Sequence, residues 1–225
     1  MNSPIGAELA PHIQHTLIAA GVTRDQVVAH AHEAVTWGFS AAMVAGSWVD
    51  VVARELAGTG VQVASALDFP TVGVMTTPGK AREAEELVRL GAQQIDMGVQ
   101  VGWLKSGDRR QFADDIRVVV GAGVPVKVML ELPLLTPDER ELAVELSIEA
   151  GAAYLKNASS GAIEVANAES IRFLAERVPE GVGVKASGGI TSVTQARALL
   201  DAGAQLLGTS AGVAIVTSGS GARSY

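Results

Sequence analysis

The chain has 225 residues, of which 48% are hydrophobic. At roughly 150 residues per domain, this length allows one large or two small domains that bury a core without disulfide bonds. The absence of cysteine excludes disulfides, iron–sulfur clusters and thiol nucleophiles, while the net charge of −7 and the 4% aromatic content disfavour a nucleic-acid partner.

Neither end of the sequence predicts a targeting or membrane segment. Residues 1–11 contain no lysine or arginine and no long apolar run, so they do not resemble a signal peptide. The longest apolar stretch, residues 118–126, is interrupted by glycine and proline and is too short to span a bilayer. We therefore expect a cytoplasmic protein with no membrane partner. Residues 218–225 are rich in glycine and serine, and we expect a flexible tail there after one domain at residues 1–217.

Short β-branched segments alternate with helical segments along the chain. Strands are predicted at Ile13–Ile18, Ser40–Ala45, Val61–Asp68, Gln94–Gln100, Val124–Glu131, Ala153–Ala158, Gly181–Ser187 and Gln205–Thr209. Helices are predicted at Arg24–Trp37, Trp48–Ala57, Ala81–Leu90, Arg109–Gly121, Pro137–Ala150, Ala168–Val178 and Ser192–Ala202, with a further short helix after the last strand. Thr23, Thr136 and Thr191 are the expected N-caps of three of these helices.

The number and spacing of the strands favour one architecture. Eight strands in 225 residues give about 28 residues for each strand–helix unit. A Gly-Ala pair recurs where helices end, at residues 91–92, 151–152 and 203–204. We therefore predict an α/β protein with a single closed (β/α)8 TIM barrel. An open doubly wound sheet is the alternative, but residues 19–22 lack the glycine-rich turn that usually follows its first strand.

Ionisable residues interrupt strands that should be apolar on both faces. These residues are Asp96, Lys127, Glu131, Lys156 and Lys185. Lys156 and Lys185 fall on neighbouring predicted strands, where burial and mutual repulsion lower the pKa of an ammonium group. A neutral amine near pH 7 can attack a carbonyl and form a Schiff base. The alternative is that each lysine forms a buried ion pair. Lys127 and Glu131 share one strand face, and we expect them to be paired or supporting residues.

Glycine-rich loops after the last two strands indicate a phosphate site. Gly188 and Gly189 follow the seventh strand, and Thr209 and Ser210 follow the eighth. Backbone N–H groups at helix starts bind phosphate without a positive side chain, and these two loops are the favoured phosphate position in a TIM barrel. The alternative interpretation is that these glycines only form turns.

Two other patterns are set aside. Residues 73–81 resemble a P-loop, but five residues separate the glycines and Ala81 stands where serine or threonine must hold magnesium. All four histidines lie within the first 32 residues, so we expect no metal site. His30 and His32 are predicted on a helix surface, and His15 is predicted to be a core residue that could reach the site.

Several blocks in this order carry a family resemblance. They are His15-Thr16-Leu17, Gln94-Ile95-Asp96-Met97, Lys127-Val128 with Glu131, Gly183–Ile190 and Gly208-Thr209-Ser210. With them, the sequence resembles the deoxyribose-phosphate aldolases, which are class I aldolases, over nearly its whole length. The resemblance implies a cofactor-free homodimer that reversibly cleaves the phosphorylated sugar 2-deoxy-D-ribose 5-phosphate to acetaldehyde and D-glyceraldehyde 3-phosphate.

The resemblance also implies residue roles. Lys156 would form the Schiff base, Lys185 would stay charged beside it, and Asp96 would transfer protons through a water. Tyr225 would act as a proton shuttle at the end of the tail. The phosphate would be held by Gly188, Gly189, Thr209 and Ser210, and Thr16 belongs to the substrate-binding set.

The chain also departs from the family pattern. Gln14 stands where the family has aspartate, and residues 157–161 are one residue longer than the usual segment after the Schiff-base lysine. The loops after the second, third and fifth strands differ too. Three alternatives therefore stay open: an aldolase with a different acceptor aldehyde or sugar, a non-covalent phosphosugar isomerase or synthase, and a non-catalytic sugar-phosphate-binding protein.

Overall fold

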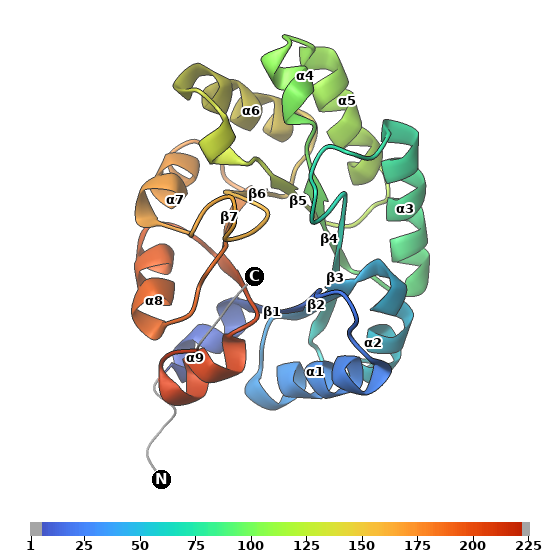
Figure 1. The fold of residues 1–225 in the computed structure, drawn as a ribbon, viewed down its shortest axis with the longest axis vertical. Helices are drawn as coiled ribbons and strands as arrows, with labels where there is room; N and C mark the ends of the chain where they lie inside the picture. Colours follow the sequence, from blue (N-terminus) through green and yellow to red (C-terminus); the bar gives the residue numbers. More distant parts are fainter. Residues whose placement is uncertain (1–5, 222–225) are drawn as a thin grey trace.

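The computed structural model describes residues 6–221, in which eight parallel strands close into one barrel (Figure 1). The strands are β1 (Ile13–Leu17), β2 (Ala41–Ala45), β3 (Gln62–Leu67), β4 (Gln94–Gly98), β5 (Val126–Met129), β6 (Tyr154–Lys156), β7 (Gly183–Ser187) and β8 (Leu206–Thr209). Each strand pairs with the next in the sequence, and β8 closes the ring on β1. The predicted single (β/α)8 barrel is confirmed.

Helices surround the ring of strands (Figure 1). They are α1 (Arg24–Trp37), α2 (Val49–Glu55), α3 (Thr77–Leu90), α4 (Val101–Lys105), α5 (Arg109–Val120), α6 (Pro137–Glu149), α7 (Ala168–Ala175), α8 (Val193–Asp201) and α9 (Gly212–Ser218). Three short 3-10 segments accompany them: η1 (Ala7–His12), η2 (Gly46–Trp48) and η3 (Leu132–Leu134). In the described part of the chain, every helix is too short or too polar to cross a membrane.

Side-chain caps set most helix starts. The hydroxyl of Thr23 accepts the backbone N–H of Gln26 at the start of α1, as predicted. The predicted cap Thr191 is wrong by one residue, because Ser192 caps α8. Helix α3 also begins four residues before its predicted start. Thr76 caps it, and Pro78 lies in the first turn, where a proline loses no helical hydrogen bond.

The barrel places apolar and polar side chains on opposite sides of its strands. Side chains alternate along a strand, and most apolar ones point outward into the shell between strands and helices. A small apolar cluster of Ala41, Met43 and Ala64 forms separately from that shell, on β2 and β3. Four strands carry buried charged residues instead: Asp96 on β4, Lys127 on β5, Lys156 on β6 and Lys185 on β7. The buried charge is therefore concentrated on one part of the ring.

The end of the described chain is attached to the barrel. Ser220 forms an isolated antiparallel bridge with Ser192. The backbone N–H of Gly221 donates to the carbonyl of Thr191 at 2.7 Å. Residues 222–225 lie outside the described residues, so the predicted flexibility of the tail stays a prediction.

Candidate active site

Three lysines surround one buried carboxylate at the centre of the barrel. Asp96 Oδ2 lies 2.7 Å from Lys185 Nζ and 3.1 Å from Lys156 Nζ. Asp96 Oδ1 lies 3.3 Å from Lys127 Nζ. Lys156 and Lys185 are register partners across β6 and β7, as the predicted strands required. The structure thus brings together Lys156, Lys185 and Asp96, which were predicted to be catalytic residues. It adds Lys127 as a third lysine in the cluster.

Burial and the neighbouring charges shift the pKa values of Asp96 and Lys127. Burial alone raises the pKa of the Asp96 carboxyl, but the charges of Lys185, Lys156 and Lys127 outweigh it and hold that pKa far below its usual value. Burial lowers the pKa of the Lys127 ammonium to about 7, although the negative charge of Asp96 opposes this. These charges therefore favour the ionised carboxylate of Asp96, and the lowered pKa of Lys127 lies near neutral pH.

Gln14 extends the cluster. Its Oε1 accepts a hydrogen bond from Lys185 Nζ at 2.6 Å. Its Nε2 donates to Gln94 Oε1 at 2.6 Å, and the Gln94 amide donates in turn to Gln62. Gln14, which stands where the family pattern has an acid, therefore keeps a hydrogen bond to Lys185 but brings no negative charge to it. Asp96 is the only acid that forms an ion pair with Lys185 among residues 6–221.

A cavity of about 700 Å³ lies at the carboxyl ends of the strands. Its lining includes three of the residues predicted to bind substrate: Thr16, Gly189 and Ser210. The other lining residues are Leu17, Ile18, Ala19, Ala20, Phe69, Pro70, Ser160, Gly161, Ala162 and Val165. Thr16 and Ser160 follow Gln14 and Lys156 closely in the chain, so the cavity lies next to the lysine cluster. Lys156, the last residue of β6, is not itself part of this lining, and neither are Lys185 and Asp96.

Gly188 and Thr209, also predicted to bind phosphate, are not part of that lining. Gly188 has φ +111, and a Cβ on it would lie 2.2 Å from the carbonyl oxygen of Glu164, so only glycine fits there. The Thr209 hydroxyl donates to the carbonyl of Ile190 at 2.7 Å. Thr209 thus links the loops after β8 and β7, and Gly188 allows the loop after β6 to approach the loop after β7. Tyr225 lies outside the described residues.

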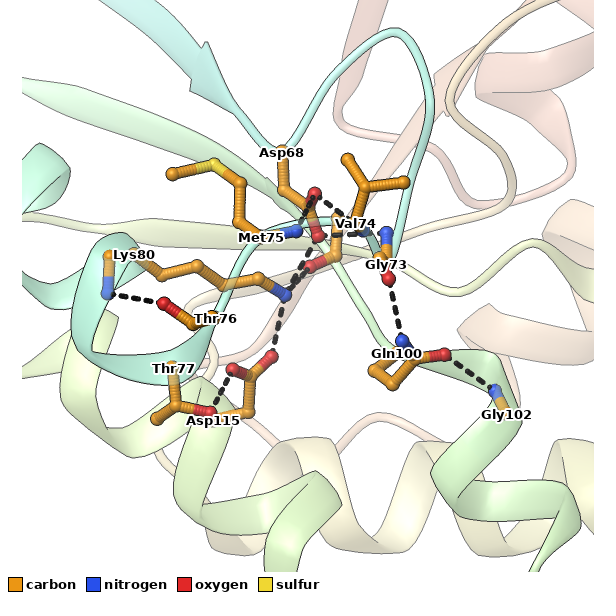
Figure 2. Close-up of polar contacts among 12 residues, drawn as sticks. Asp68, Gly73, Val74, Met75, Thr76, Thr77, Lys80, Gln100, Gly102 and Asp115 are labelled. Carbon is orange, nitrogen blue, oxygen red and sulfur yellow. Dashed lines mark hydrogen bonds and ion pairs between the residues drawn. The ribbon is translucent and has the colours of Figure 1, made fainter.

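The loop after β3 is fixed by a second buried ion cluster (Figure 2). The Asp68 carboxylate accepts the backbone N–H groups of Gly73, Val74 and Met75 at 2.8 to 3.0 Å. Lys80 Nζ lies 2.9 Å from Asp68 Oδ2, 2.6 Å from Asp115 Oδ2 and 2.7 Å from the carbonyl of Gly98.

This cluster explains why the P-loop-like sequence of residues 73–81 is not a phosphate site. The backbone N–H groups of its first three residues are already used by Asp68. The ammonium group of its lysine, Lys80, is fully buried among three oxygen atoms. The cluster fixes the loop that carries Phe69 and Pro70 into the wall of the cavity.

Glu131 is a second buried carboxyl in this region, and it lines a smaller cavity. The sequence analysis predicted it to be a paired or supporting residue. It is 1% exposed and has a left-handed backbone conformation with φ 54. Burial raises the pKa of its carboxyl, and the hydrogen bond from Ser159 and the charge of Lys156 oppose this increase. The predicted strand face shared by Lys127 and Glu131 is wrong, because β5 ends at Met129 and Lys127 contacts Asp96 instead.

The histidines lie outside the barrel interior, and the prediction for His30 is wrong. His30 is 4% exposed and stacks on His15 with ring centroids 4.2 Å apart. Burial lowers the pKa of His15 to about 4, and burial together with the charge of His15 lowers that of His30 to about 3. One ligand atom of each of His15, His30 and Glu33 lies within 4.8 Å of the others. In the structure, His15 Nε2 lies 2.9 Å from Glu33 Oε2, and His30 Nε2 is hydrogen-bonded to the carbonyl of His15 at 3.1 Å.

Comparison with known proteins identifies the family. No family model matches the chain. A deoxyribose-phosphate aldolase from Methanothermobacter thermautotrophicus is 43% identical over 218 residues, which cover 96% of this chain and 97% of that protein. The chain belongs to the deoxyribose-phosphate aldolase family. A second relative with this name, from Exiguobacterium sp., is 39% identical over 94% of this chain and 97% of its own length.

A solved structure agrees with this assignment. The deoxyribose phosphate aldolase from Aeropyrum pernix superimposes with a TM-score of 0.84 at 29% identity, over 94% of this chain and 90% of that chain. That protein is described as a tetramer. The protein is therefore an enzyme of the aldehyde-lyase class, and the resemblance inferred from the sequence is confirmed.

Proposed function

We propose that the protein reversibly cleaves 2-deoxy-D-ribose 5-phosphate into acetaldehyde and D-glyceraldehyde 3-phosphate through a Schiff base on Lys156. The observation that carries this proposal is the contact of two lysine ammonium groups, those of Lys156 and Lys185, with one oxygen of Asp96. A neighbouring cation favours loss of a proton from an amine, and Schiff-base formation requires the neutral amine, whereas the Asp96 carboxylate favours the ammonium form. Membership of the aldolase family supports the reaction class.

Lys156 is the best placed of the three lysines. It is the last residue of β6 and is 2% exposed, whereas Lys127 and Lys185 are completely buried. Lys185 is further held by Gln14 and Asp96 at 2.6 and 2.7 Å. We therefore assign the nucleophile to Lys156 and the fixed neighbouring cation to Lys185.

The proposed steps follow from this arrangement. The neutral amine of Lys156 adds to the substrate aldehyde, and uptake of a proton with loss of water gives a protonated imine. The bond between carbons 2 and 3 breaks, its electrons form an enamine, and the hydroxyl on carbon 3 loses its proton as glyceraldehyde 3-phosphate leaves. Protonation of the enamine and hydrolysis of the imine release acetaldehyde and regenerate Lys156. Asp96, acting through a water, is the proposed group for the proton transfers.

The phosphate is proposed to bind at the loops after β7 and β8. Gly189 and Ser210 line the cavity, and Gly188 and Thr209 fix the loops behind them. Thr16 lines the same cavity. The family resemblance makes Tyr225, at the end of the sequence, the proposed proton shuttle.

Borohydride trapping tests the proposal. Reduction in the presence of acetaldehyde should leave an ethyl group on Lys156, which peptide mass spectrometry locates. A Lys156→Ala variant should form no adduct and lose activity, whereas a Lys105→Ala variant, altered at an exposed lysine, should behave like the wild type. Full activity in Lys156→Ala would refute the Schiff-base mechanism and favour a non-covalent reaction on the same barrel.

The assembly is a separate proposal. The family resemblance implies a homodimer in the cytoplasm, whereas the Aeropyrum pernix relative is described as a tetramer. We propose the homodimer, and light scattering of the purified protein distinguishes the two.

A further inference from the structure

Glu131 has a buried carboxyl group whose hydrogen bonds are only half satisfied. Its Oε1 accepts the backbone N–H of Ser159 at 2.8 Å. Its Oε2 is buried and has no hydrogen-bond partner among residues 6–221. Buried carboxylate oxygens normally have a partner, so an oxygen that lacks one is a candidate to bind a water or a ligand atom.

The position of Glu131 is set by its neighbours on both sides. The backbone N–H of Leu130 donates to the carbonyl of Lys156 at 3.0 Å, and that of Leu132 donates to Asn157 at 3.1 Å. Glu131 therefore lies directly beside the end of β6, where Lys156 is located. Its left-handed backbone, which is rare for a residue other than glycine, turns the chain at this point.

Glu131 lines a cavity of about 330 Å³ that adjoins the larger one. Pro70 lines both cavities, and the consecutive residues Ser159 and Ser160 line one each. The remaining lining residues of the smaller cavity are Thr71, Val72, Gln100, Val101, Leu134 and Ile163. Glu131 is the only ionisable residue in this lining.

Among the other polar side chains of this lining, the Gln100 amide already has hydrogen-bond partners. The Gln100 amide donates to the carbonyl of Gly73 at 2.5 Å and accepts the N–H of Gly102 at 2.9 Å (Figure 2). A polar group that enters this cavity therefore finds its strongest acceptor at Glu131 Oε2. Glu131 Oε2 can accept a hydrogen bond from a hydroxyl group, and aldol substrates carry a hydroxyl next to the reacting carbon.

We propose that Glu131 is a substrate-binding residue that accepts a hydrogen bond from a hydroxyl of the acceptor aldehyde, and that it selects hydroxylated over unsubstituted aldehydes. This inference rests on the proposed function, in which Lys156 holds the donor carbons. With the donor on Lys156, the acceptor half of the substrate lies at the cavity end of β6, next to Glu131. Neither the family comparison nor the lysine cluster requires this role.

The test compares two acceptors of equal carbon number. D-glyceraldehyde carries hydroxyls and propanal carries none, and acetaldehyde is the donor for both. The ratio of kcat/KM for glyceraldehyde to that for propanal is measured in the wild type, Glu131→Gln and Glu131→Met. Glu131→Gln keeps the shape and the Ser159 contact, so it controls for loss of fold.

Glu164→Gln is the matched control. Glu164 anchors the same loop through Asn157, Asn167 and Ser170, but it lines neither cavity. We expect the ratio to fall by about 10- to 100-fold in Glu131→Met, the size of a lost hydrogen bond to a charged group, and by less in Glu131→Gln. The ratio in Glu164→Gln should match that of the wild type.

Equal losses for the two aldehydes in both Glu131 variants would overturn the inference, because a purely structural residue affects both acceptors alike. A wild-type ratio near one would overturn it as well. Borohydride trapping of acetaldehyde on Lys156 uses no acceptor and separates the two proposals. An adduct without acceptor selectivity refutes the role of Glu131 alone, and absence of the adduct in the wild type refutes the proposed function.

Discussion

Lys156 and Lys185 face each other across β6 and β7, and their ammonium nitrogens lie 3.1 and 2.7 Å from the same oxygen of Asp96. Lys127 approaches the other oxygen of this carboxylate at 3.3 Å. One buried carboxylate is thus the shared contact of three lysine side chains. We therefore expect both the stability of the barrel interior and the proposed reaction to depend on Asp96.

Asp96→Asn should therefore destabilise the protein strongly. Removing one partner of a buried ion pair typically costs about 3–5 kcal/mol, because the remaining charge stays buried without compensation. Urea unfolding at pH 7 measures the change. Asp114→Asn, which removes an exposed partner of Arg117, should change the free energy of unfolding by less than about 1 kcal/mol. Similar values for the two variants would contradict the buried role of Asp96.

Lys127→Met should have an effect on stability that depends on pH. Burial lowers the pKa of Lys127 to about 7 from its ordinary 10.5, so between these values the unfolded chain binds a proton that the folded chain does not. This group then adds stability as pH rises through that window. Relative to the wild type, Lys127→Met should be more stable at pH 6 than at pH 9.5.

Urea unfolding at both pH values measures this difference. Lys105→Met, which alters an exposed lysine paired with Glu139, should give a difference from the wild type that is nearly independent of pH. A constant difference for Lys127→Met as well would show that Lys127 titrates normally.

His30→Gln should reduce the acid sensitivity of the fold. Burial lowers the pKa values of His15 and His30 to about 4 and 3, so the unfolded chain takes up protons first as pH falls below about 6.5. Stability is therefore lost between pH 6.5 and 4. We expect a shallower loss in His30→Gln, measured by urea unfolding at pH 6.5, 5 and 4. His32→Gln, on an exposed position of the same helix, should follow the wild type.

Lys80→Met should destabilise the loop after β3. The substitution leaves the carboxylates of Asp68 and Asp115 buried without their shared cation, at an expected loss of about 3–5 kcal/mol in unfolding free energy. Arg54→Met removes one partner of an exposed pair with Asp50 and should be nearly neutral. If Lys80→Met unfolds at the same urea concentration as Arg54→Met, the buried cluster does not stabilise the loop.

The barrel and its lysine pair could be predicted because they follow from local periodicity. Polar residues at regular positions in apolar strands indicated which side chains face inward, and parallel pairing brought Lys156 and Lys185 together. The burial of His30 could also have been predicted from the sequence. Val27, His30 and Ala34 are spaced as one helix face, and all three are buried.

The loops were harder to predict because their contacts are distant in sequence. Lys80 meets Asp115, 35 residues later, and the carbonyl of Gly98, 18 residues later. The polar surroundings of Glu131 depend on Ser159, 28 residues away. No pattern within a short window specifies such contacts, since each depends on how several strand ends are arranged around the barrel mouth.

The loop after β3 has a consequence for how this site can diversify. Asp68 holds the loop through backbone N–H groups of Gly73, Val74 and Met75, which every residue except proline provides. Side chains at Pro70, Thr71 and Val72, which line the smaller cavity, are not used in that attachment. Substitutions there can reshape the entrance while the anchor stays intact, which makes this segment a starting point for evolving aldolases with new acceptor preferences.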